Sequence, residues 1–68
     1  MNNDISYETE HRDACRLYGV APLPAYKVRQ LERAGYSLDD AYSVACDRLA
    51  GFTYSEALAA IQRARVAA

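Results

Sequence analysis

The chain has 68 residues, of which 51% are hydrophobic and 25% charged, and its formal net charge is −1. This composition is typical of one small folded domain and excludes the low-hydrophobicity, high-charge class of disordered proteins. Because the chain has eight basic and nine acidic residues, no global electrostatic field attracts it to nucleic acid or to an anionic membrane. Binding to either would have to depend on a local patch.

The N-terminal residues lack the basic start and apolar run of a signal peptide, and no apolar stretch approaches the roughly 20 residues that a membrane span needs. We therefore expect a cytoplasmic protein without membrane contact, in which residues 1–5 are disordered. A reducing cytosol would keep Cys15 and Cys46 as thiols.

Four segments with a helical period of 3.6 residues predict an all-α fold, a single domain over residues 1–68. The expected architecture is a compact bundle of four short helices joined by tight corners, with no competing strand pattern. The helices are expected at about 7–18, 24–34, 38–50 and 54–66.

The first predicted helix begins after the cap residue Ser6 and ends at Gly19. A proline-rich connector follows, and Pro24 is expected as the first residue of the second helix. The side chains expected to be buried in these two helices are Tyr7, His11, Ala14, Cys15, Tyr18, Val28 and Leu31.

The second half repeats a pattern at an offset of sixteen residues, because residues 34–41 align with residues 50–57. Each copy has a glycine that ends a helix, an aromatic ring, a hydroxyl residue that caps the next helix and an acid three residues later. The pattern predicts two tight helix-to-helix corners, with the rings of Tyr36 and Phe52 packed as staples. The side chains expected to be buried in the third and fourth helices are Leu38, Ala41, Tyr42, Ala45, Leu49, Tyr54, Ala57, Leu58 and Ile61.

The segment from Gln30 to Ala41 resembles two known patterns. One is the ubiquitin-associated domain, a three-helix bundle whose first loop carries a Met-Gly-Phe-like turn where this chain has Ala34-Gly35-Tyr36; this resemblance implies ubiquitin binding. The other is the helix that follows the DNA-binding head of mercury-resistance-type regulators, which often reads Leu-Gly-Phe-Ser-Leu-Glu-Glu. Both similarities reduce to the chemistry of the corner, so we interpret them as convergence on a favourable turn.

His11 and Cys15 have the spacing of metal ligands on one helix face, and Cys46 is a third candidate. Structural zinc sites normally present paired ligands, and buried cysteine usually packs as a small hydrophobe. The three glycines all stand at predicted helix ends, so none forms a phosphate-binding loop. We expect no metal, no cofactor and no enzymatic activity.

Six tyrosines in so short a chain suggest a binding surface, since tyrosine is enriched at protein interfaces. On the second helix, Tyr26, Gln30 and Arg33 form a row at i, i+4 and i+7 that points away from the predicted core. Tyrosine and arginine are common in binding hot spots. The predicted partner-binding residues are Tyr26, Lys27, Arg29, Gln30 and Arg33.

The expected function is therefore a small protein-binding module, a regulator or inhibitor that occupies a partner's surface. Phage and mobile-element accessory proteins, such as anti-CRISPR and other anti-defence inhibitors, are of this kind, and a homodimer is plausible. The alternative is a helix-turn-helix-like nucleic-acid-binding regulator. Against it, the third helix begins Leu38-Asp39-Asp40, which would bring carboxylates towards the phosphates.

Overall fold

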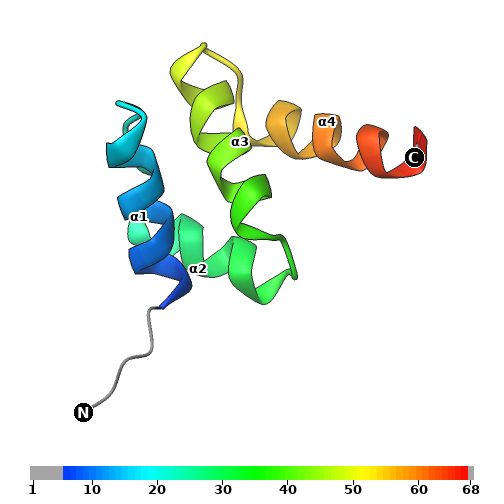
Figure 1. Cartoon of the computed structure of the whole chain (residues 1–68). Coiled ribbons are helices and arrows are strands. Elements are labelled where there is room, and N and C mark those ends of the chain that lie inside the picture. The colour runs from blue at the N-terminus through cyan, green and yellow to red at the C-terminus, as the bar shows by residue number, and fades with distance from the viewer. Residues whose placement is uncertain (1–5, 68) are drawn as a thin grey trace.

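The computed structural model describes residues 6–67, which form four helices (Figure 1). They are α1 (Tyr7–Leu17), α2 (Ala25–Arg33), α3 (Leu38–Leu49) and α4 (Tyr54–Ala67). The described residues contain no strand, so the prediction of an all-α fold is confirmed. The prediction of disorder over residues 1–5 lies outside the described residues.

The helix boundaries agree with the predicted ranges to within one residue, but the place of Pro24 was predicted wrongly. Pro24 is the N-cap of α2, with φ −58° and ψ 148°, and is not its first helical residue. An extended ψ keeps Pro24 outside the helix, while its carbonyl accepts the first two hydrogen bonds, from the amides of Lys27 and Val28.

The two predicted corners are present and have the same chemistry. At the α2–α3 corner, the Ser37 hydroxyl accepts from the Asp40 amide at 3.1 Å, and the Asp40 carboxylate accepts from the Ser37 amide at 3.2 Å. Thr53 and Glu56 make the equivalent pair of bonds at the α3–α4 corner. The residues that end the preceding helices, Gly35 (φ +88°) and Gly51 (φ +101°), are left-handed.

The core lies where α1 packs against both α2 and α3, and α4 packs against α3. Its buried side chains are Cys15, Leu23, Val28, Leu31, Ala41, Val44, Ala45 and Ala57, together with His11. Burial of Val28, Leu31, Ala41, Ala45 and Ala57 was predicted and is confirmed.

Two large side chains that were predicted to be buried are exposed. Tyr18 is 67% exposed because it caps the end of α1, beyond its last turn, and its ring meets Tyr42 edge-on at the surface. Leu49 is 65% exposed because it is the last residue of α3, where the chain leaves the core. The core instead includes Leu23 and Val44, whose burial was not predicted. Phe52 also remains half exposed, so the staple at the α3–α4 corner is partial.

Tyr7 fastens the start of α1 to the α2–α3 corner. Its hydroxyl lies 3.0 Å from the carbonyl oxygens of both Tyr36 and Ser37 and donates to them. Burial, followed by the nearby carboxylates of Asp40 and Glu32, raises the pKa of Tyr7 above its ordinary value. The phenol therefore stays protonated, as this donor role requires.

Candidate functional site

The outer face of α2 carries a row of three exposed side chains, Tyr26, Gln30 and Arg33, which we call the α2 row. Tyr26 is 57% exposed although it is a large aromatic residue. The opposite side of the same helix is anchored by Val28 and Leu31, which are 1% and 3% exposed. The structure thus brings these three predicted site residues together on a firmly held helix, as their spacing predicts.

The other two predicted site residues, Arg29 and Lys27, contact side chains of neighbouring helices. Arg29 donates to the carboxylate of Glu8 on α1 at 3.3 Å, and both side chains remain partly exposed. Lys27 is half-buried, with its Nζ 4.3 Å from the centre of the Tyr54 ring. Lys27 is therefore engaged at the start of α4, and the predicted five-residue site divides into the α2 row and two tethered cations.

A second cation, the guanidinium of Arg48, also lies over the ring of Tyr54. The guanidinium carbon of Arg48 lies 4.8 Å from the ring centre, and Arg48 donates to the carbonyl oxygen of Phe52 at 2.9 Å. A cation over an aromatic face contributes about 0.5–2 kcal/mol, depending on its desolvation. Lys27 and Arg48 thus join α2 and α3 to the first turn of α4, which is a structural role.

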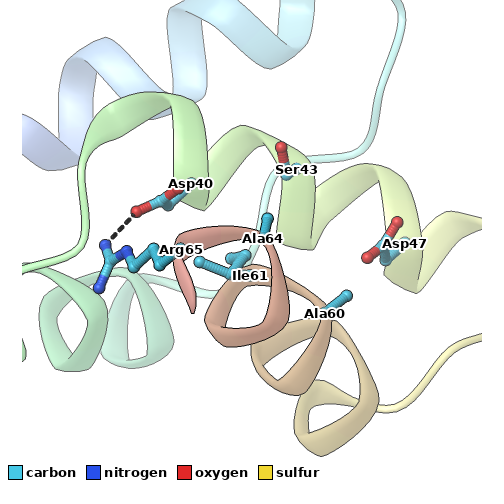
Figure 2. Close-up of a pocket in the computed structure, with 7 residues that line it drawn as sticks. All are labelled: Asp40, Ser43, Asp47, Ala60, Ile61, Ala64 and Arg65. Carbon is cyan, nitrogen blue, oxygen red and sulfur yellow. Dashed lines mark hydrogen bonds and ion pairs between the residues drawn. The ribbon is translucent and has the colours of Figure 1, made fainter. Parts of the chain in front are cut away.

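A groove of about 510 Å³, which was not predicted, lies between α3 and α4 (Figure 2). We call it the α3–α4 groove. Arg65 crosses one end, where its guanidinium meets the Asp40 carboxylate at 2.7 Å. Its lining residues are Asp40, Ser43, Asp47, Ala60, Ile61, Ala64 and Arg65.

A second hollow, of about 420 Å³, shares Asp47 and Ala60 with the α3–α4 groove and also meets Phe52, Glu56 and Arg63. The two hollows therefore adjoin along α4. The only sequence signal was indirect: Asp40, Ser43 and Asp47 recur at three- and four-residue intervals on one helix, as Ala60 and Ala64 do on the other.

The candidate metal or nucleophile pair, His11 and Cys15, is part of the core. His11 is 1% exposed, and its Nε2 accepts from the Leu23 amide at 3.1 Å. The Cys15 sulfur lies 3.6 Å from the same nitrogen. In residues 6–67 no group of three or more His, Cys, Asp or Glu side chains is placed to hold a metal ion.

Burial decides the protonation of this pair. It lowers the pKa of His11, and it raises the pKa of Cys15, with a smaller contribution from Cys46. A neutral imidazole beside a protonated thiol is the reverse of the imidazolium and thiolate that activate a nucleophilic cysteine. Cys15 and Cys46 are both free thiols.

Comparison with protein-family models, with curated proteins and with solved structures finds no match to this chain. None of the described helices is long and apolar enough to cross a membrane. The functional argument therefore depends on the surfaces described above.

Proposed function

We propose that this protein is a protein-binding regulator or inhibitor that occupies a partner's surface with the α2 row. The observation that carries the proposal is the exposed ring of Tyr26, which shares a helix face with Arg33 while Val28 and Leu31 hold the other face in the core. Tyrosine and arginine are the residue types that most often dominate binding energy.

The α2 row also suggests the chemistry of the partner. Arg33 makes no ion pair with any described residue, so its guanidinium is available for a carboxylate. Tyr26 offers a large apolar area with a polar tip, and only two side-chain dihedrals are fixed when it binds. The partner surface that fits best is an apolar pocket for Tyr26 with an acidic group beside it for Arg33.

The helix-turn-helix alternative is less well supported. The helix that would enter the DNA groove carries Asp39 and Asp40 in its first turn, and Asp40 is already bonded to the Ser37 amide and to Arg65. Asp47 adds a third carboxylate one turn beyond Ser43. A recognition helix with this charge would be repelled by phosphates, whereas a protein partner imposes no such penalty.

The proposal includes a non-enzymatic role in the cytoplasm. The neutral, buried His11–Cys15 pair supports it, and two free thiols are compatible with a reducing compartment. Inhibitors of host defence from phages and mobile elements, such as anti-CRISPR proteins, act by covering a partner surface in this way. We propose this class as the form of regulator to test first.

Affinity capture with the full chain tests the proposal. The bait is immobilised, exposed to a nuclease-treated lysate of the source organism, and compared with Tyr26→Ala and Arg33→Ala baits. The matched controls are Tyr18→Ala and Arg16→Ala, which remove the exposed tyrosine that caps α1 and an exposed arginine in its last turn. We expect one stoichiometric protein to be captured by the wild type and by both controls.

Calorimetry with that purified partner then measures the binding free energy that each variant loses. Each α2-row variant should weaken binding by about 2 kcal/mol, roughly thirtyfold, with an unchanged melting temperature. Equal binding by all four variants would show that α2 is not the binding face. Capture that occurs only when the nuclease is omitted, with similar salt-dependent losses for Lys27→Ala, Arg29→Ala and Arg33→Ala, would favour the helix-turn-helix alternative.

A further inference from the structure

The connector between α1 and α2, residues 20–24, is tied to the helices by few polar contacts. Pro22 and Pro24 have no amide hydrogen to donate. At its two ends the connector continues the hydrogen bonding of α1 and α2. Between these ends, one hydrogen bond among the described residues joins it to a helix, from the Leu23 amide to Nε2 of His11 at 3.1 Å.

The connector is also thinly packed. Pro22 and Leu23 line a hollow of about 70 Å³ that faces α1 and α2, and they line another of about 330 Å³ that faces α3 and the start of α4. Leu23 is the one buried side chain of the connector, while Val20 is half-buried. Leu23 is therefore its main attachment, through a side chain in the core and an amide on His11.

The hydrogen bond from Leu23 fixes the protonation of His11. A backbone amide can only donate, so Nε2 provides the lone pair and the neutral ring holds its proton on Nδ1. A second proton on this ring must go to Nε2, the atom that holds the connector. It converts the acceptor into a donor, which then opposes the N–H of Leu23.

No carboxylate in residues 6–67 lies within ion-pair distance of the His11 ring. From α1, the protonated thiol of Cys15 lies 3.6 Å from Nε2, and Glu8 and Arg12 line the adjacent hollow. Glu8 is already paired with a cation of α2. The connector and α2 bring no charged side chain to this hollow, and from α3 the free thiol of Cys46 acts on Cys15. An imidazolium would thus be buried without a counter-ion.

We propose that His11 is a pH-sensitive switch, in which protonation of Nε2 releases residues 20–24 while the four helices stay folded. Leu23 is the one buried core residue that the connector contributes, and the others belong to the helices. Their packing therefore survives the release. The released connector exposes Leu23 and opens the small hollow, so water reaches the imidazolium.

The direction of the switch follows from linkage. Burial lowers the pKa of His11 below 6.5 in the closed state, and contact with water raises it again in the released state, so acid favours release. Between the two pKa values, the ratio of released to closed chain rises up to about tenfold for each pH unit of acidification.

A pH titration of the isotope-labelled full chain from about pH 8 to about pH 4, followed by NMR, tests the switch. His11 is the only histidine of the chain, so its ring signals report its protonation directly. We expect the proton on Nδ1 at neutral pH. The amides of Ala21 and Leu23 should shift towards disordered values with the same midpoint as the ring, while the amide of Val44 in the core keeps its native position.

Two variants separate His11 from the neighbouring carboxylate. His11→Gln supplies an amide oxygen that accepts from Leu23 at any pH, so the shifts of the connector amides should fall at least about tenfold. Glu8→Gln is the matched control, because it neutralises the carboxylate that lines the same hollow. The transition should persist there, with a midpoint within about half a pH unit of the wild type.

A transition that persists in His11→Gln or disappears in Glu8→Gln overturns the proposal. So does a His11 titration that leaves the Leu23 amide unmoved, or a His11 ring that stays neutral until Val44 also loses its native position. These last two results come from the wild type, so they decide the matter even if His11→Gln does not fold. Tyr26→Ala should leave the titration unchanged, so the switch and the α2-row proposal can fail independently.

Discussion

The corner glycines allow the cost of a backbone conformation to be measured in isolation. Gly35 has φ +88°, and no atom lies within 4 Å of the place where a Cβ would stand. A methyl group added there meets no steric neighbour, so Gly35→Ala changes stability through the backbone alone. The substitution can therefore be compared directly with its mirror image, the replacement of Gly35 by D-alanine.

The change in stability expected for Gly35→Ala follows from two opposing effects. A left-handed conformation costs an L-residue about 1–2 kcal/mol, while the lower entropy of the unfolded chain offsets about 0.4–1 kcal/mol. We expect Gly35→Ala to destabilise the fold by about 1 kcal/mol and Gly35→Val by more. For 68 residues the unfolding entropy is roughly 0.14 kcal/mol/K, so 1 kcal/mol lowers Tm by about 7 °C.

D-Alanine favours positive φ, so it lowers the entropy of the unfolded chain without straining the backbone of the folded one. We expect the Tm of the chain with D-alanine at position 35 to exceed that of the wild type by about 3–7 °C. The Tm values of the wild type and of the L-alanine and D-alanine variants are measured on chemically synthesised chains, by thermal melts monitored by circular dichroism. Equal shifts for L- and D-alanine would refute the reasoning, and Gly51, with φ +101° and an equally open site, is the independent repeat.

Three further predictions concern stability. Ser37→Ala and Thr53→Ala should each lower the free energy of unfolding by about 1 kcal/mol through loss of a cap, measured by urea titration. The double variant Cys15→Ala/Cys46→Ala should be modestly less stable, because it leaves small cavities, with no change in zinc content by mass spectrometry; one equivalent of zinc in the wild type would contradict this. Because burial lowers the pKa of His11 below the 6.5 of the unfolded chain, the contribution of His11 to stability should be fully present above pH 6.5 and be lost as the pH falls below it. The slope should be at most about 1.4 kcal/mol per pH unit until the folded-state pKa is passed, and urea titrations in which stability rises on acidification would contradict it.

The corners were predictable because all their determinants lie within eight consecutive residues. A glycine, a hydroxyl and an acid at fixed offsets specify Ser37 with Asp40 and Thr53 with Glu56 without any tertiary information. Leu23 shows the opposite case. Its burial depends on the connector folding back so that its amide reaches His11, twelve residues earlier, and no periodicity encodes that contact.

The same distinction applies to the candidate surfaces. The α2 row follows from helical spacing on a helix with one clear apolar side, so Tyr26 and Arg33 could be placed outside the core in advance. The sequence alone could not distinguish Lys27 from these exposed residues, because Lys27 is held by a tertiary contact between α2 and Tyr54 of α4. The α3–α4 groove depends on how two helices diverge after a corner, which local pattern does not specify.

The shallow burial of α4, in which Ala57 is the one fully buried residue over 54–66, divides the molecule into regions of unequal stability. Detachment of α4 from the other helices uncovers Ala57 and half-buried Leu58 and Ile61, while the other core residues, which lie in α1 to α3 and at Leu23 of the connector, stay packed. The backbone amides of residues 54–67 should therefore exchange with deuterium through a local opening of lower free energy than global unfolding. A partner that covers α4 would slow exchange in this segment first, so its protection reports occupancy of the α3–α4 groove.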